Sequence, residues 1–187
     1  MERYSMKVIG LVGLPASGKG ECSSIARDLD IPVVVMGDII RKFAMDEGLE
    51  ATDLHLGGIA RRLREERGMA ALAELTAPVV EEYSDPVILI DGIRGEAEVK
   101  FFREIFDDFT LIAIDCQFPL RLSRLRERGR SDDNLTESDL RSRDERECSF
   151  GLGDAMDGAD IRISNTGTLE SFREEFRSIM KELRGIS

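Results

Sequence analysis

The segment Gly13–Gly20 restricts the fold of this chain more strongly than any other part of the sequence. It reads G-L-P-A-S-G-K-G and follows the apolar run Val8–Val12. A buried strand that leads into a G-x-x-x-x-G-K loop and then a helix is a phosphate-binding unit. The glycines let backbone N–H groups point at phosphate oxygens, and the helix adds its positive N-terminal end. We therefore expect Lys19 to reach the β- and γ-phosphates of a nucleotide. The residues expected to line this site are Gly13, Leu14, Pro15, Ala16, Ser17, Gly18, Lys19, Gly20 and Glu21.

The loop departs from the common motif at one position. Gly20 follows Lys19, whereas most loops of this type have a Ser or Thr whose hydroxyl contacts Mg²⁺. Glu21 comes next, so no neighbouring hydroxyl replaces the missing one. The alternative interpretation is a tight glycine turn in an ordinary strand–helix unit, which leaves the lysine and its context unexplained.

Length and composition indicate a single globular domain over residues 1–187. Hydrophobic residues make up 42% of the chain and charged residues 34%, which is typical of a chain with a packed core. No apolar run approaches the roughly 20 residues that cross a bilayer. Met1–Ser5 lead into the first strand without a signal peptide. We expect a cytoplasmic protein that does not bind a membrane.

Charge and the rare residue types exclude several classes of function. The formal net charge of −11 argues against a broad nucleic-acid-binding surface, so we expect no nucleic-acid partner. His55 is the only histidine, which excludes a His-based triad and a multi-histidine metal site. The three cysteines lack metal-ligand spacing and are interpreted as reduced thiols.

The remaining sequence alternates strands and helices. The predicted strands cover residues 7–12, 33–35, 87–90, 110–114 and 160–163. The predicted helices cover 18–29, a stretch from about 37, 54–67, 70–83, 95–106, 119–128, 137–148 and 169–183. This pattern is typical of an α/β fold, a five-stranded parallel sheet with helices on both faces. The glycine-rich stretch 149–154 is interpreted as a turn back toward the sheet.

Polar residues follow the predicted strands at the edge where parallel sheets bind ligands. Asp91 ends the third strand, where a carboxylate usually holds Mg²⁺ or its water; the alternative is a helix N-cap. Asp38 is equally consistent with a cap and with a site residue. Arg41 and Arg94 lie just past two strand ends, where two guanidinium groups would grip a second phosphate; the alternative is a pair of solvated surface arginines. The predicted substrate-binding residues are Gly37, Asp38, Arg41 and Arg94.

A second arginine-rich segment, at about 121–147, is predicted to form a lid. Phosphoryl transfer needs positive charge around the moving group, and a flexible arginine-dense hairpin would supply it. The alternative is a solvated helical pair with i,i+4 ion pairs. The expected catalytic residues are Lys19, Asp91, Arg126, Arg130 and Arg143.

With these residues assembled, the chain resembles the nucleoside monophosphate kinases, adenylate kinase above all. The resemblance rests on G-K-G at 18–20, G-D-I-I-R at 37–41 and D-G-I-R at 91–94. The strings G-K-G-E, V-V-V-M-G-D, D-G-I-R and G-R-S-D-D are most similar to an archaeal family of nucleotide-kinase-related P-loop proteins, over nearly the whole chain.

The resemblance implies a P-loop NTPase fold with a small helical acceptor-binding insert at about 37–83 and a lid at about 121–147. It also implies that Arg41 and Arg94 hold an acceptor monophosphate, and that ATP with Mg²⁺ is the donor. The adenine of ATP would then lie beside two residues that follow the fifth strand, Asn165 and Gly167.

Three departures from typical adenylate kinases bear on the metal and on the acceptor. Glu21 replaces a Thr, no proline precedes Arg94, and Met36 stands where a Thr commonly contacts the acceptor base. The metal geometry and the identity of the acceptor therefore stay open.

We expect an ATP-dependent phosphotransferase that transfers the γ-phosphate to a nucleoside monophosphate, AMP-like first, or to a related small phosphorylated acceptor. One alternative is a hydroxyl kinase of the dephospho-coenzyme A type, with Asp38 as the general base. The other is a non-kinase ATPase or nucleotide-dependent switch, and only this one calls for a protein partner.

Overall fold

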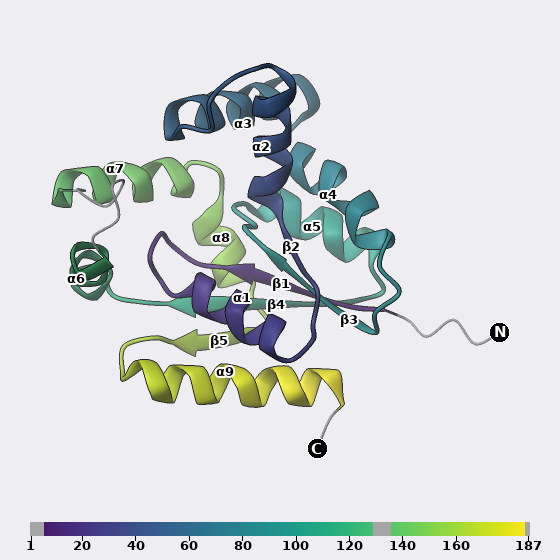
Figure 1. Cartoon of the computed structure of the whole chain (residues 1–187), viewed down its shortest axis with the longest axis vertical. Helices are drawn as coiled ribbons and strands as arrows, with labels where there is room; N and C mark the ends of the chain where they lie inside the picture. Colours follow the sequence, from purple (N-terminus) through teal and green to yellow (C-terminus); the bar gives the residue numbers. More distant parts are fainter. Residues whose placement is uncertain (1–5, 129–135, 186–187) are drawn as a thin grey trace.

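Five parallel strands form the central sheet, in the order β2-β3-β1-β4-β5 (Figure 1). The computed structural model describes residues 6–128 and 136–185. The strand pairings in this part are all parallel, which confirms the predicted α/β fold. The strands are β1 (Lys7–Val12), β2 (Val33–Val35), β3 (Val87–Asp91), β4 (Asp108–Asp115) and β5 (Ile161–Ser164).

Helices connect the strands and cover both faces of the sheet. They are α1 (Lys19–Asp28), α2 (Met36–Asp46), α3 (Asp53–Arg67), α4 (Ala71–Glu81), α5 (Glu96–Ile105), α6 (Phe118–Arg128), α7 (Glu137–Cys148), α8 (Leu152–Asp157) and α9 (Leu169–Arg184). None of the helices in the described ranges combines the length and the hydropathy that crossing a bilayer requires.

Successive residues of the strands pack into two separate hydrophobic cores. Ile9 of β1 belongs to one core, together with Ile25 of α1 and Phe172 of α9. Val8 of the same strand belongs to the other core, together with Phe102 of α5. Adjacent strand residues point to opposite faces, so an apolar strand such as β1 is stable only when both faces are covered.

The strand register brings the predicted site segments to one edge of the sheet. Leu11 of β1 pairs with Asp91 of β3, and Val35 of β2 pairs with Asp91 from the other side. The three strands therefore end at nearly the same level. The phosphate loop, the β2–α2 junction and the segment after β3 leave the sheet next to one another.

Two pairs of helices extend beyond the sheet (Figure 1). Helices α2 and α3 stand over α4 and fall in the range predicted for the acceptor insert. Helices α6 and α7 lie past the carboxyl ends of the strands, in the range predicted for the lid. The division of the chain into insert and lid stays a prediction.

The sequence predicted a turn at residues 149–154, but the structure shows a turn followed by a short helix. A left-handed Gly151 (φ 86°) ends the turn, and α8 begins at the next residue. This helix is six residues long and is too short to form on its own. The burial of Leu152 and Ala155 against the sheet stabilises it, and such tertiary packing leaves little local signal.

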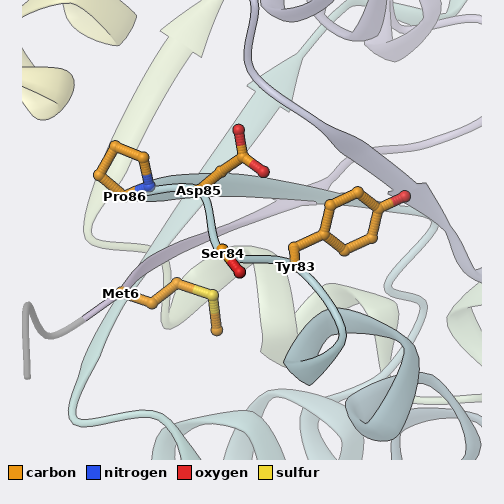
Figure 2. A pocket seen from close by; sticks show the side chains of 5 residues that line it. All are labelled: Met6, Tyr83, Ser84, Asp85 and Pro86. Atoms are coloured by element: carbon orange, nitrogen blue, oxygen red, sulfur yellow. The ribbon is translucent and has the colours of Figure 1, made fainter.

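A cavity of about 320 Å³ lies at the opposite, amino edge of the sheet (Figure 2). Its lining residues immediately precede β1 and β3, whereas the phosphate loop follows β1. This cavity is therefore remote from the phosphate loop. Its lining residues are Met6, Tyr83, Ser84, Asp85 and Pro86.

Candidate active site

The loop between β1 and α1 has the backbone conformation of a phosphate cradle. Ala16 and Gly18 both have positive φ values, 60° and 117°. A Cβ atom on Gly18 would overlap with the side-chain amide of Asn165, and one on Gly13 would lie 2.6 Å from Ser17 Oγ. The space around these two glycines therefore admits no side chain, whereas a Cβ on Gly20 would meet no atom within 4 Å.

Lys19 begins α1 and folds its side chain back along the loop. Its Nζ donates hydrogen bonds to the carbonyl oxygens of Gly13 and Leu14, the latter at 3.1 Å. Desolvation lowers the pKa of Lys19, while the charges of Glu147 and Asp91 act to raise it. The strongest charge effect on this lysine comes from Glu147, a residue of α7 that sequence reasoning did not single out.

Asp91 is the last residue of β3 and does not cap a helix, because Gly95 is the N-cap of α5. Ser23 of α1 donates a hydrogen bond to Asp91 Oδ2 at 2.7 Å, which fixes the carboxylate beside the phosphate loop. The capping alternative for this residue is therefore wrong.

The donor set at this edge fits Mg²⁺ bound mainly through phosphate and water. In the described ranges, no cluster of three or more His, Cys, Asp or Glu residues could enclose a metal ion. Mg²⁺ commonly uses one or two carboxylates and completes its shell with water and substrate phosphates. Asp91 would supply that carboxylate. Ser17 Oγ is buried in the loop without a hydrogen-bond partner in the described structure, which marks a polar site suited to a polar ligand.

The β2–α2 junction carries Gly37, Asp38 and Arg41. Val35 is the N-cap of α2, so Asp38 lies within the first turn and does not cap the helix. Arg41 Nη1 donates to Asp38 Oδ1 at 2.5 Å, and both side chains are exposed. A Cβ on Gly37 would lie 3.4 Å from Arg41 Nη1, so the guanidinium lies over the start of α2.

Arg94 lies in the segment after β3 and is held at two points. Its backbone N–H donates to Glu98 Oε2 at 2.7 Å. Its Nη1 lies 3.6 Å from Glu147 Oε1. Arg94 also acts electrostatically on Lys19, lowering its pKa. The guanidinium, the lysine and two carboxylates, Asp91 and Glu147, therefore form one charged cluster at the sheet edge.

Helices α6 and α7 are joined to the phosphate loop by a buried arginine. Arg121 donates to both carboxylate oxygens of Asp144, at 2.8 and 2.6 Å. The same side chain donates to Pro15 O in the phosphate loop at 3.1 Å and to Cys116 O at 3.2 Å. Arg121 therefore has a structural role that the arginine count alone did not reveal.

The three predicted lid arginines differ in their surroundings. Arg126 is exposed on α6, and Arg143 is half-buried on α7. Arg130 lies outside the described residues. An i,i+4 ion pair of the kind expected for a solvated helix is present on α7, between Arg141 and Glu137 at 2.7 Å. Catalytic roles for the three arginines stay predictions.

The segment after β5 contacts the phosphate loop and supports it. Asn165 is 2% exposed; its Nδ2 donates to Ser17 O at 2.8 Å, and its Oδ1 accepts from Arg124 Nη2 at 3.1 Å. Gly167 is exposed just before α9. Glu21 pairs with Arg173 of α9 at 2.8 Å. The Asn165 side chain thus holds the loop itself, and its predicted place beside the adenine stays a prediction.

Comparisons with known proteins show the family and the fold of this chain. The family model described as AAA domain matches residues 12–139. A UPF0200 protein of Methanoculleus marisnigri is 56% identical over 96% of this chain and 98% of its own length. The fold is similar to that of TT1252 from Thermus thermophilus, with a TM-score of 0.67, 15% identity, and coverage of 95% of this chain and 98% of the other.

The fold is also similar to a shikimate kinase from Bacteroides thetaiotaomicron, with a TM-score of 0.56, 17% identity, and coverage of 97% and 99%. At these identities the structural neighbours establish the fold alone, which this chain shares with the shikimate kinase. The identity to the archaeal relative and the length it covers establish the family. The chain belongs to the UPF0200 family and carries a AAA-type P-loop domain with a kinase-like fold.

Proposed function

We propose that this protein is an ATP-dependent phosphotransferase that acts on a small phosphorylated acceptor, with nucleoside monophosphates such as AMP first among the candidates. The observation that carries the proposal is the charged cluster at the sheet edge. Arg94, Asp91 and Glu147 all act electrostatically on Lys19, and Arg94 Nη1 lies 3.6 Å from Glu147 Oε1. Donor-binding and acceptor-binding groups therefore lie within reach of one another.

On the donor side, the loop amides and Lys19 would bind the β- and γ-phosphates. The Ser23 hydrogen bond orients Asp91, the residue that would hold Mg²⁺ directly or through water. Bound Mg²⁺ supplies positive charge that offsets the charge developing on the transferred phosphoryl group. Arg121, which donates to Pro15 O, keeps α6 and α7 against the loop.

On the acceptor side, Arg94 and Arg41 follow neighbouring strands and would hold the acceptor phosphate. An anionic phosphate needs no general base to become a nucleophile, so positioning and charge neutralisation suffice for the transfer. The surrounding carboxylates Asp38 and Glu147 keep the two guanidinium groups oriented.

A second candidate is a kinase for a hydroxyl acceptor. It is favoured by Asp38, an exposed carboxylate in the first turn of α2 that could accept a proton from the acceptor hydroxyl. The structural neighbour named as a shikimate kinase shows that this fold occurs in a kinase named for an acceptor other than a nucleotide.

The test is ADP production by the purified protein with ATP and Mg²⁺. The acceptor panel contains nucleoside monophosphates, dephospho-coenzyme A and no acceptor. A rate that rises with one acceptor and is abolished in Lys19→Ala, while Lys181→Ala at an exposed position of α9 retains it, supports the proposal. Slow ADP release that ignores every acceptor contradicts it and favours a nucleotide-dependent switch.

A further inference from the structure

The carboxyl end of α7 and the turn that follows it lie against the segment that carries Arg94. Gly95, the N-cap of α5, has no room for a side chain, because a Cβ atom there would overlap with the carbonyl oxygen of Phe150. From the other side, a Cβ on Gly151 would lie 3.5 Å from the backbone nitrogen of Glu96. Backbone therefore packs on backbone between residues 94–98 and 147–151, and we call these two segments the seam.

Charged side chains cross the seam at Arg94. Glu147 is buried, with 10% of its side chain exposed, and its Oε1 lies 3.6 Å from Arg94 Nη1. This separation is too long for a good hydrogen bond, so the contact is an ion pair that restrains the guanidinium. The arginine side chain is 40% exposed, which leaves part of its donor fork accessible.

A second contact fixes the backbone of Arg94. Glu98 Oε2 accepts from Arg94 N at 2.7 Å, and Glu98 Oε1 accepts from Arg64 Nη2 of α3 at 2.9 Å. Burial raises the pKa of Glu98, and Arg64 acts in the opposite direction. The Arg64 guanidinium in turn lies 4.5 Å from the centre of the Phe150 ring, in the same turn that follows Glu147.

The contacts close a ring: Glu147 holds the Arg94 side chain, Glu98 holds its backbone, Arg64 neutralises Glu98, and Phe150 covers Arg64. We propose that Glu147 positions the acceptor phosphate by fixing Arg94, the arginine that binds that phosphate. The packing of the seam holds Glu147 in place. This inference rests on the proposed function, and it couples the acceptor site to the helix of the predicted lid.

Two substitutions disrupt the contact between Glu147 and Arg94 across the seam by different routes. Glu147→Gln removes the charge and keeps the side-chain volume. Gly95→Ala keeps the charge but pushes the Phe150 turn away from Arg94. Glu145→Gln is the matched control, because Glu145 is exposed on the same helix. In both seam variants the acceptor KM should rise by roughly two- to five-fold, the range expected for losing one partly exposed ion pair. In Gly95→Ala, which keeps the Glu147 charge that acts on Lys19, the ATP KM should change less than the acceptor KM.

A second measurement does not depend on turnover. The arginine Nε–Hε NMR cross-peak of Arg94, assigned by its loss in Arg94→Lys, reports the environment of the guanidinium. It should be separate from the cross-peaks of exposed arginines in the unaltered protein and in Glu145→Gln. It should move toward them in Glu147→Gln and in Gly95→Ala.

The outcomes distinguish the inference from the function beneath it. An unmoved Arg94 cross-peak, or an acceptor KM that falls in Glu147→Gln because the carboxylate competes with phosphate, overturns the positioning role. If no acceptor supports turnover, the proposed function fails, and the cross-peak alone decides whether Glu147 positions Arg94.

Discussion

Arg121 of α6 donates two hydrogen bonds to Asp144 of α7, and 3% of the arginine side chain and 17% of the aspartate side chain are exposed. The pair is bidentate, which is the strongest geometry available to an arginine and a carboxylate. Because Arg121 also donates to Pro15 O, the two helices past the sheet edge are attached directly to the phosphate loop.

Asp144→Ala should destabilise the fold strongly, because it leaves Arg121 buried without its charge partner. Removing one member of a buried pair costs about 3 kcal/mol of the free energy of unfolding. Urea unfolding followed by circular dichroism measures the change. The control is Lys100→Ala, which breaks the exposed pair with Glu96 and should cost less than about 0.5 kcal/mol. Equal effects of the two substitutions would show that the buried Arg121–Asp144 pair contributes no more to the free energy of unfolding than an exposed ion pair does.

Alanine substitutions at two glycines of the phosphate loop should change the stability of the fold in opposite directions. Gly18 has φ 117°, and its missing side chain makes room for Asn165, so Gly18→Ala combines backbone strain with a clash. We expect a loss of at least about 2 kcal/mol and weak ADP binding. Gly20 has open space and lies in the first turn of α1, so Gly20→Ala should stabilise by about 0.5 kcal/mol.

Thermal unfolding and titration with a fluorescent ADP analogue test both expectations. If Gly20→Ala abolished binding while it left stability intact, a close approach of ligand to that backbone would be indicated, and the protein interior would not be the reason for the glycine.

Much of the fold followed from patterns that act locally. The apolar runs at β1 and β3 predicted buried parallel strands. The loop 13–20 predicted that a helix follows β1. Such features depend on backbone conformation and on burial, and both leave a recognisable pattern within a short stretch of sequence. Helix α8 was missed because its stability comes from the sheet beneath it.

The site was harder to predict because partners come from distant segments. The arginine-rich stretch was recognised, yet nothing in its pattern distinguished Arg121, whose partner Asp144 is 23 residues away, from its solvated neighbours. Glu147 sits in a strongly charged helix and carries no local signal at all. Only the packing of residues 147–151 against 94–98 places its carboxylate next to Arg94, where its charge also acts on Lys19.

The three thiols should differ in reactivity with iodoacetamide. Cys22 is fully buried, and burial together with the charge of Asp91 raises the pKa of its thiol, so little of the reactive thiolate forms. Cys148 is exposed and Cys116 is half-buried. Mass spectrometry of the labelled folded protein should show Cys148 modified first and Cys22 modified only after unfolding. Early labelling of Cys22 would mean that α1 opens readily.

Lys19 should give nucleotide binding an alkaline limit. Desolvation lowers the pKa of Lys19 from 10.5, so the free protein loses this charge at a lower pH than an exposed lysine does. Nucleotide affinity should therefore fall at a lower pH than it would if Lys19 had the ordinary lysine pKa of 10.5. Between the lowered pKa and 10.5 the unfolded chain binds more protons than the folded chain, so the contribution of Lys19 to stability rises with pH in that window.

The two effects have opposite signs, which separates loss of binding from loss of the fold. Isothermal titration with ADP across this pH range, alongside urea unfolding at each pH, measures both. In Lys19→Arg the guanidinium keeps its proton throughout, so any remaining affinity should show no alkaline limit from this position. An identical decline in Lys19→Arg and in the unaltered protein would assign the limit to another group, because the arginine cannot lose its charge there.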